Sequence, residues 1–355
     1  MCILVCIGIL AISSATSFSG DRQTLIKQIL FFVIGLILMI IIMFINYRKL
    51  GEYYILIYII TNVILLSVLL VGVANKGATR WIDLGFIEIQ PSEFAKISMI
   101  FCTAKLISKC NSKINSIISI GKIGLFQFIP FILINRQPNL STSLVILMLL
   151  VVQLFISNLK MKYILSVTLI GIITLSIGVG YIIRNPNQNI IDDYQRNRIV
   201  SAFTGGNSQS DNYQTSRSID AIGSGGLYGK GIYEGAISQL NYLPESHNDF
   251  IVATIAEEFG FVGIFILLTT IILFIARGLH LAYIVTDDFG KLIIVGYIGM
   301  IAAQSFINLG VVTGILPNTG LPLPFVSYGG SSLWANMMGM GLVLSVGVNR
   351  EETMF

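Results

Sequence analysis

Ten apolar runs, most of them close to 20 residues long, follow one another along this chain of 355 residues. A helix of about 20 apolar residues spans the hydrocarbon core of a bilayer. Only 11% of the residues are charged, against about 25% in soluble domains. The pattern predicts an all-α integral membrane protein of about ten transmembrane helices, forming a single polytopic domain over residues 1–355. The runs cover roughly residues 2–17, 24–46, 53–74, 92–109, 122–136, 140–157, 160–183, 250–279, 291–314 and 329–348.

The first run has the length of a secretory signal peptide. It lacks the basic segment that precedes such a signal, and a second run follows directly, so we expect a transmembrane helix instead. The four cysteines show no CxxC spacing, and we expect neither a disulfide nor a metal site from them. The net charge of +4 does not indicate nucleic-acid binding, because the basic residues lie in short loops between apolar runs.

Lysine and arginine are distributed unevenly between the two sets of short loops. One set carries eleven: Arg48, Lys49, Lys105, Lys109, Lys113, Lys122, Lys160, Lys162, Arg277, Lys291 and Arg350. The opposite set carries five: Arg22, Lys27, Lys76, Arg80 and Arg136. The richer side of a membrane protein is normally cytoplasmic. We therefore predict that both termini are cytoplasmic and that the long loop, residues 184–249, is extracellular.

Four of the even-numbered runs begin with polar or proline-rich sequence. In the predicted topology these runs enter the membrane from outside, so their helix N-termini gather at the outer face. Helix N-termini carry unpaired N–H groups and a partial positive charge, which attract anions. The sequence therefore predicts one outward-facing site. The four starts are residues 90–96, 136–142, 244–249 and 321–332.

Residues 241–260 combine several ionisable groups with the start of an apolar run. Such groups cost roughly 2.5–3.5 kcal/mol each at membrane depth and usually mark function. Asp249 is either a site carboxylate or an acid stabilised by the helix dipole. Glu257 and Glu258 lie deeper and are expected to be internal supports, while Glu245 and His247 are expected to neighbour the site.

Glu93 and Lys96 stand three residues apart, so they can pair on one helix face. The pair is either structural or part of the site, with Lys96 meeting an anionic substrate. Arg80 precedes Trp81 in a predicted outer loop, where a tryptophan is usually an interfacial anchor. An arginine beside an outward site also suits phosphate recognition.

The glycine-rich run at residues 223–231 superficially resembles a phosphate-binding loop. The required spacing fails, because Ser224 stands where a glycine is needed and Gly231 follows the lysine. The run is either a flexible turn or a mobile loop that places Lys230 near a substrate phosphate. Asn308, in an otherwise apolar run, is expected to serve helix packing.

Several long motifs resemble the SEDS family (shape, elongation, division and sporulation), represented by RodA and FtsW. The resemblance covers nearly the whole chain. It is closer to the RodA branch, because the sequence pattern of that branch is followed by the segments GSGGLYGKG and QLNYLPE. The motifs are GATRWI at 77–82, QPSEFAK at 90–96, AIGSGGLYGKG at 221–231, LPESHNDF at 243–250, AEEFGFVG at 256–263 and ILPNTGLPLPFVSYGGSS at 315–332.

The resemblance implies a peptidoglycan glycosyltransferase that polymerises lipid II at the outer face of the bacterial cytoplasmic membrane. It implies a class B penicillin-binding protein as partner, and it assigns the family's essential aspartate to Asp249. Two positions depart from the family pattern: Asn139 replaces an aspartate and Asn248 replaces a threonine. A role for an acid at position 139 therefore does not carry over.

The expected reaction joins a sugar hydroxyl to an anomeric carbon that bears a lipid diphosphate. We expect Asp249 to act as the general base. The substrate-binding candidates are Arg80, Glu93, Lys96, Arg196, Arg198, Lys230, Glu245, His247 and Ser327. No cofactor is evident, although a divalent cation could assist the leaving diphosphate. The rival hypotheses are a flippase for a lipid-linked precursor and a non-catalytic scaffold for cell-wall enzymes.

Overall fold

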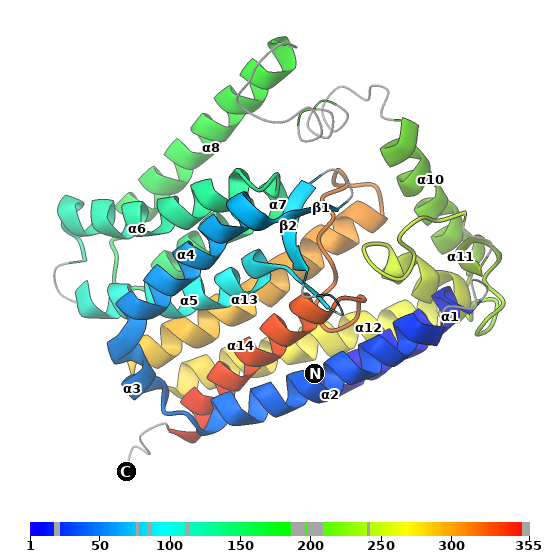
Figure 1. The fold of residues 1–355 in the computed structure, drawn as a ribbon, viewed down its shortest axis with the longest axis horizontal. Coiled ribbons are helices and arrows are strands. Elements are labelled where there is room, and N and C mark those ends of the chain that lie inside the picture. The colour runs from blue at the N-terminus through cyan, green and yellow to red at the C-terminus, as the bar shows by residue number, and fades with distance from the viewer. Residues whose placement is uncertain are drawn as a thin grey trace. The chain divides into compact units, whose positions relative to one another are not determined.

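The computed structural model describes residues 1–17, 22–75, 78–83, 85, 87–110, 114–185, 196, 200, 209–239 and 242–349. Each of the ten predicted apolar runs contains a helix, with ends within a few residues of the predicted ones (Figure 1). These helices are α1 (Cys2–Ala15), α2 (Arg22–Phe44), α4 (Tyr54–Val71), α5 (Pro91–Cys110), α6 (Ile117–Asn135), α7 (Leu140–Ile156), α8 (Met161–Arg184), α12 (Ile251–Ile284), α13 (Asp288–Val312) and α14 (Gly330–Val348).

Shorter elements connect them. The long predicted loop contains a helix of its own, α10, between α8 and α12. The remaining elements are α3 (Tyr47–Leu50), η1 (Gly51–Tyr53), α10 (Gln209–Ser224), α11 (Ala236–Gln239), β1 (Val73–Asn75), β2 (Ala78–Asp83) and β3 (Glu88–Ile89).

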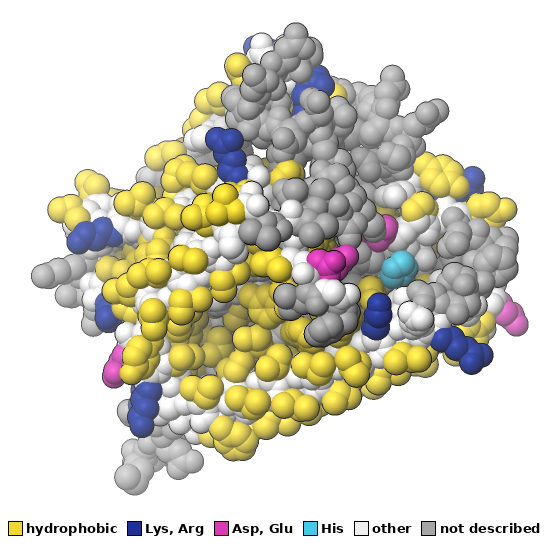
Figure 2. Space-filling model, viewed as in Figure 1, with side chains coloured by type: hydrophobic (Ala, Val, Ile, Leu, Met, Phe, Trp, Pro, Cys, Tyr) yellow, Lys and Arg dark blue, Asp and Glu magenta, His cyan; other side chains and the backbone are white. Residues whose placement is uncertain are grey.

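Within the described part of the chain, seven helical stretches are long and apolar enough to cross a membrane, and α1 and α7 are shorter apolar helices. Large hydrophobic side chains stand exposed along α2 and α4, where Figure 2 shows a broad hydrophobic surface. A hydrophobic surface of this size is favourable in contact with lipid and unfavourable in contact with water. The predicted helical membrane class is thus confirmed. The number of ten spans, the cytoplasmic termini and the outward loop remain predictions.

The chain divides into two compact units, each built from separate segments. The first comprises Met1–Gly35, Asn197–Ala276 and Ile301–Trp334, and the second comprises Leu36–Arg196, Arg277–Met300 and Ala335–Phe355. The division falls within α2, α12, α13 and α14. The single domain over residues 1–355 stays a prediction.

Buried side-chain amides join the helices of the second unit. Gln127 accepts a hydrogen bond from Thr103 (2.8 Å) and donates to the carbonyl of Ile146 (2.8 Å), which links α5, α6 and α7. Gln153 donates to the carbonyl of Ile100 (2.8 Å), and Gln137 donates to that of Leu65 (2.7 Å). Side-chain hydrogen bonds between helices supply cohesion where lipid weakens the hydrophobic drive for association.

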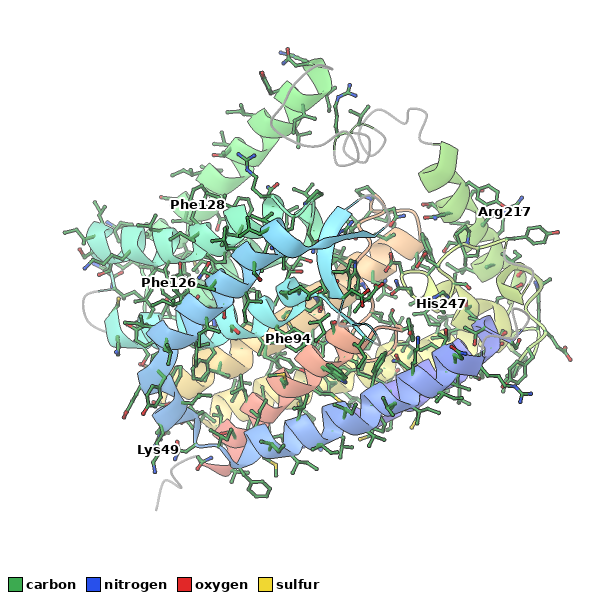
Figure 3. The ribbon with its side chains drawn as sticks, in the orientation of Figure 1. Lys49, Phe94, Phe126, Phe128, Arg217 and His247 are labelled. Atoms are coloured by element: carbon green, nitrogen blue, oxygen red, sulfur yellow. The ribbon has the colours of Figure 1, made fainter. Side chains whose placement is uncertain are left out.

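Aromatic stacking adds to these contacts between α4 and α6. The rings of Tyr58 and Phe126 stack with their centroids 3.8 Å apart, and the Tyr58 hydroxyl donates to the Phe126 carbonyl at 3.0 Å. Figure 3 labels Phe126 on α6. This half-buried tyrosine therefore has a hydrogen-bond partner for its hydroxyl.

The strands β1, β2 and β3 form a small antiparallel sheet between α4 and α5. Val73 pairs with Trp81, and Ile82 pairs with Ile89, so the chain returns to the start of α5 at Pro91. The sequence predicted only a loop here, because strands of two to six residues are too short to show an alternating pattern. Proline suits the first turn of α5, where its missing N–H costs nothing.

Helix α12 is kinked in the first unit, where the sequence predicted one uninterrupted span. Gly260 has φ 63° and ψ −158°, outside the helical region. This conformation is unfavourable for a residue with a side chain, whereas glycine adopts it readily. The kink separates the first turns of α12 from the rest of the helix, and the backbone groups that it exposes need other partners.

Candidate active site

Asp249 lies in a tight loop immediately before α12 and is partly exposed. The loop turns at Glu245, whose carbonyl accepts from the backbone N–H groups of Asn248 (3.0 Å) and Phe250 (3.3 Å). Glu245 has φ 59°, in the left-handed region that is unfavourable for a residue with a side chain. Strain of this kind persists only where surrounding contacts enforce it, and it concentrates at functional sites.

The other carbonyls of this loop are also bonded. Thr254 donates its hydroxyl to Ser246 O (3.1 Å), and Tyr328 N donates to His247 O (3.0 Å). Every backbone carbonyl of residues 245–249 has a donor, since Asn248 O and Asp249 O are bonded to side chains described below. The loop that carries Asp249 is therefore fixed along its whole length.

In the first unit, the segment that contains Ser327 and Tyr328 contacts the Asp249 loop at His247 and Asn248. The rings of His247 and Tyr328 lie edge to face, with centroids 5.7 Å apart at 65°. The Ser327 hydroxyl donates to Asn248 O (2.7 Å) and accepts from Leu323 N (2.8 Å). Ser327, a predicted substrate-binding residue, uses its hydroxyl in both of these bonds, and its contact with substrate remains a prediction.

Glu257 and Glu258 are buried, as expected for internal supports. The Glu257 carboxylate accepts from Lys230 Nζ (2.8 Å) and from Ile237 N (3.0 Å). The Glu258 carboxylate accepts from the hydroxyl of Ser14 on α1. These pairings explain how two acids are tolerated near the start of an apolar helix.

The glycine-rich segment 225–231 lies against the kink of α12. It hydrogen-bonds to the backbone groups that the kink leaves unpaired on both sides. Lys230 N and Gly231 N donate to the carbonyls of Glu257 (3.0 Å) and Glu258 (3.1 Å). Beyond the kink, Phe261 N and Val262 N donate to the carbonyls of Gly226 (2.9 Å) and Leu227 (3.1 Å). A broken helix leaves unpaired groups at both new ends, and this segment pairs them.

Close backbone approach explains the glycines of this segment. A Cβ added to Gly225 would stand 1.9 Å from Ala256 O, and one added to Gly229 would stand 2.0 Å from Glu258 O. The predicted alternatives were a flexible turn and a substrate loop. The structure shows a packed segment in which the Lys230 ammonium is already held by Glu257.

We predict that Gly225→Ala lowers the stability of the protein by roughly 1–3 kcal/mol, the usual cost of overpacking. Gly223→Ala is the matched control in the same motif, because a Cβ at Gly223 meets nothing within 4 Å. Gly223 lies in α10, where alanine is favoured over glycine by up to about 1 kcal/mol, so its Tm should stay level or rise. Thermal unfolding in detergent measures both, and equal Tm values for the two variants would contradict the packing explanation.

Four of the predicted site residues lie in the second unit. Lys96 and Glu93 form an ion pair at 2.9 Å near the start of α5, with side chains 1% and 5% exposed. Arg80 lies on β2, Arg196 is a single described residue after α8, and both are partly exposed. Arg198 lies outside the described residues.

Asn139 ties the start of α7 to α5. Its Oδ1 accepts from Thr142 N (3.4 Å) as an N-cap, and its Nδ2 donates to Ser92 Oγ (3.1 Å). The side chain is buried. The asparagine that departs from the family pattern is therefore used structurally through both of its polar atoms.

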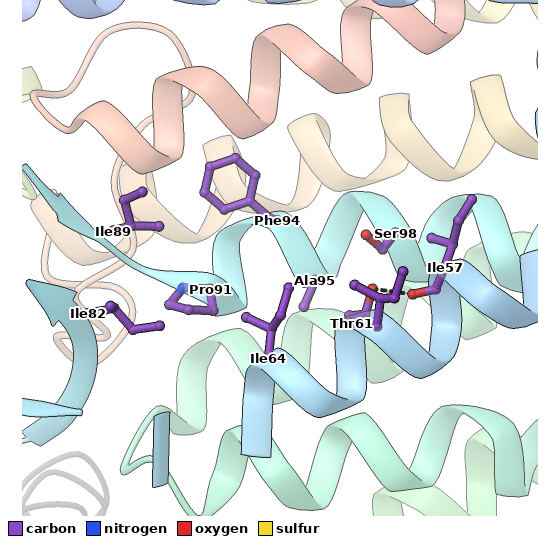
Figure 4. Close-up of a pocket in the computed structure, with 10 residues that line it drawn as sticks. Ile57, Thr61, Ile64, Ile82, Ile89, Pro91, Phe94, Ala95 and Ser98 are labelled. Carbon is purple, nitrogen blue, oxygen red and sulfur yellow. Dashed lines mark hydrogen bonds between the residues drawn. The ribbon is translucent and has the colours of Figure 1, made fainter. Parts of the chain in front are cut away.

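A cavity of about 390 Å³ opens beside this region, between α4, α5 and the small sheet (Figure 4). Its lining is almost entirely apolar. The lining residues are Ile57, Ile60, Thr61, Ile64, Ile82, Ile89, Pro91, Phe94, Ala95 and Ser98.

Among the described residues, no group of three or more histidine, cysteine, aspartate or glutamate side chains could hold a metal ion. The divalent cation expected to assist a diphosphate remains a prediction.

The fold and this loop define a polytopic helical membrane protein with a fixed, partly exposed aspartate at the start of a kinked helix. Residues 1–352 match the model of the cell cycle protein family of FtsW, RodA and SpoVE. The chain belongs to this family, which confirms the resemblance found in the sequence.

Individual relatives match over more than nine-tenths of their lengths. The peptidoglycan glycosyltransferase MrdB of Escherichia coli is 36% identical, covering 98% of this chain and 93% of the relative. A chain from a structure of a peptidoglycan synthase complex, concerned with polymerization and crosslinking, matches with TM-score 0.83 and 30% identity over 99% of this chain and 96% of its own. Thermus thermophilus rod shape determining protein RodA matches with TM-score 0.74 and 29% identity over 99% and 95%.

Proposed function

We propose that this chain is a peptidoglycan glycosyltransferase that polymerises lipid II into glycan strands at the outer face of the cytoplasmic membrane, for cell elongation and shape. A relative with 36% identity over 98% of the chain carries this enzyme name, which confirms the enzyme class predicted from the sequence. The observation in the structure that carries the proposal is the fixed loop of residues 245–249, because it holds the aspartate that the family resemblance assigns to catalysis.

In the proposed reaction, a hydroxyl of the acceptor sugar attacks the anomeric carbon of the donor. The new C–O bond forms as the bond to the lipid diphosphate breaks, and the hydroxyl proton passes to the Asp249 carboxylate. Inverting glycosidases place the same demand on their general base. A rigid backbone at the base favours this step, because proton transfer depends on a donor–acceptor distance of about 2.6–3.2 Å.

The leaving diphosphate requires positive charge. We propose Arg80 and Arg196 first, because the planar fork of arginine matches phosphate oxygens in a bidentate manner. Arg198 is proposed with them from the sequence. Lys96 and Lys230 are weaker candidates, since Glu93 and Glu257 hold their ammonium groups at 2.9 and 2.8 Å.

A class B penicillin-binding protein is proposed as the partner, which would crosslink the strands that this chain polymerises. The structural match to a chain of a peptidoglycan synthase complex supports this proposal. We propose that the protein lies in the bacterial inner membrane as a multi-pass protein with its site facing outward.

The apolar cavity between α4 and α5 is proposed to hold part of the polyprenyl tail of a lipid-linked sugar. Its lining is mostly aliphatic, and the lining residues Ile60 and Ile64 are about half exposed, so an alkyl chain could enter from the surrounding lipid. Each methylene group that it shelters contributes about 0.8 kcal/mol to binding.

We predict that Ser98→Phe, which fills this cavity, raises the KM for lipid II roughly tenfold, the equivalent of about two methylene groups at ~0.8 kcal/mol each. The turnover number should change little, because Ser98 touches no reacting atom in the proposed mechanism. Leu56→Phe is the control, since Leu56 is exposed on α4 and does not line the cavity. An unchanged KM in Ser98→Phe would remove the cavity from substrate binding.

A polymerisation assay with purified protein and lipid II, with and without the partner, tests the proposed function. Glycan strands that form with the purified chain support an enzyme. A flippase would move lipid II across vesicles without polymerising it, and it needs polar groups along a path to the cytoplasmic side. A scaffold would show neither activity, and cells would tolerate replacement of Asp249.

A further inference from the structure

We propose that Asn308 and Ser327 are positioning residues that set the location of the Asp249 carboxylate. This inference rests on the proposed function, in which Asp249 is the general base. The sequence indicated Asn308 only as a packing residue and Ser327 as a substrate ligand.

Asn308 holds the backbone of Asp249 directly. Its Nδ2 donates to Asp249 O and to Leu321 O, both at 2.8 Å. Two carbonyl acceptors fix the orientation of the amide, because only its NH₂ group can donate to both. Asn308 is 1% exposed on α13, so these bonds form away from water and are strong.

Ser327 holds the neighbouring carbonyl from a different segment. Its hydroxyl donates to Asn248 O at 2.7 Å, while the backbone N–H of Tyr328 takes His247 O. Three consecutive carbonyls, those of residues 247, 248 and 249, are thus bonded to residues 59 to 81 positions later in the chain.

The segment that holds the loop is itself anchored. Gln28 of α2 donates to Ser327 O at 3.5 Å and accepts from Gly329 N at 3.3 Å, and its side chain is buried. The Leu323 carbonyl also accepts from Ser327 N at 3.0 Å. Ser327 is therefore held by α2 and by its own turn, and it can transmit that fixed position to the Asp249 loop.

This arrangement suits a general base. The direction of a short aspartate side chain follows from the position of its own backbone, and a displacement of about 1 Å in a reacting group can cost on the order of 100-fold in rate. Asn308 and Ser327 contact the backbone of the loop, so they act through Asp249.

The test compares Asn308→Asp, Ser327→Ala and Ser327→Thr in the full-length protein. For each variant, KM for lipid II and kcat per folded molecule are measured. Asn308→Asp keeps the shape of the side chain, but an ionised carboxylate cannot donate to two carbonyls. We expect its kcat to fall ten- to 100-fold with KM within twofold of wild type. We expect Ser327→Ala to lose about tenfold in kcat and Ser327→Thr to recover most of it, because threonine restores the hydroxyl. A purely structural role would lower the folded fraction and leave kcat per folded molecule unchanged.

Ser305→Ala is the matched control, because Ser305 is buried three residues before Asn308 on α13 and its hydroxyl has no bond to the loop. It should keep wild-type kcat. If Asn308→Asp does not fold, the two Ser327 variants decide the test. Normal kcat in the folded Asn308 and Ser327 variants, together with an inactive Asp249→Asn, would overturn the positioning role alone. An active Asp249→Asn would overturn the base assignment, and an inactive wild type would overturn the proposed function.

Discussion

Asp249→Asn should abolish polymerisation of lipid II, with kcat lowered by about 10²–10⁴, the usual contribution of a general base. Asparagine has the shape of aspartate, so the bonds to the backbone of residue 249 should persist and the protein should fold normally. It cannot take the proton of the attacking hydroxyl. Glycan formation by purified protein measures the effect, with the Tm in detergent recorded beside it.

Asp220→Asn is the matched control for charge removal. Asp220 lies on α10 in the same unit, and its side chain is 52% exposed in a 3.5 Å pair with Arg217. An exposed pair contributes little to stability, so this variant should keep wild-type activity and Tm. Near-normal polymerisation by Asp249→Asn would refute the base assignment.

Lys230→Met should lower stability by about 3 kcal/mol, the lower end of the cost of removing one partner of a buried ion pair, because the Lys230 side chain is itself 30% exposed. Its partner Glu257 is 0% exposed, so loss of the ammonium leaves a carboxylate in an apolar interior. The backbone bonds of Lys230 and Gly231 to the kink remain in this variant. The predicted loss therefore isolates the charge pair, and thermal unfolding in detergent reports it.

Lys230→Met/Glu257→Gln should recover much of the lost stability, because glutamine removes the stranded charge and can still accept from Ile237 N. Double variants of this kind separate the pair energy from the separate effects of each residue. Arg217→Met is the control at an exposed pair and should cost no more than about 1 kcal/mol. A Tm of Lys230→Met equal to that of Arg217→Met would show that the Lys230–Glu257 pair contributes no more to stability than an exposed ion pair. Loss of polymerisation at unchanged Tm would instead return Lys230 to the substrate site.

Much of the helical framework could be predicted from the sequence. The ten apolar runs each contain a helix, because the cost of placing a residue in lipid depends on the residue itself and needs no knowledge of its neighbours. The three-stranded sheet before α5 and the kink at Gly260 were missed. Both depend on pairing with other segments, and a glycine in an apolar run gives no local sign of a break.

The candidate site was predicted only in part. Asp249, Glu257 and Glu258 stood out because ionisable groups are costly beside an apolar run. The partners of these residues could not be read from the sequence. The Lys230 ammonium was expected to meet phosphate and is held by Glu257, and Ser327 was expected to meet substrate and bonds to Asn248 O.

By itself, the sequence determined the membrane class, the succession of helices, the family resemblance and the position of an acid at the start of α12. These follow from local composition and from motifs. Only the tertiary structure decided how that acid is held. Asn308 meets Asp249 across 59 positions, Ser327 meets Asn248 across 79, and Ser14 meets Glu258 across 244. Such contacts arise because buried polar groups must find hydrogen-bond partners wherever the packed helices bring them, and that arrangement is a property of the folded chain.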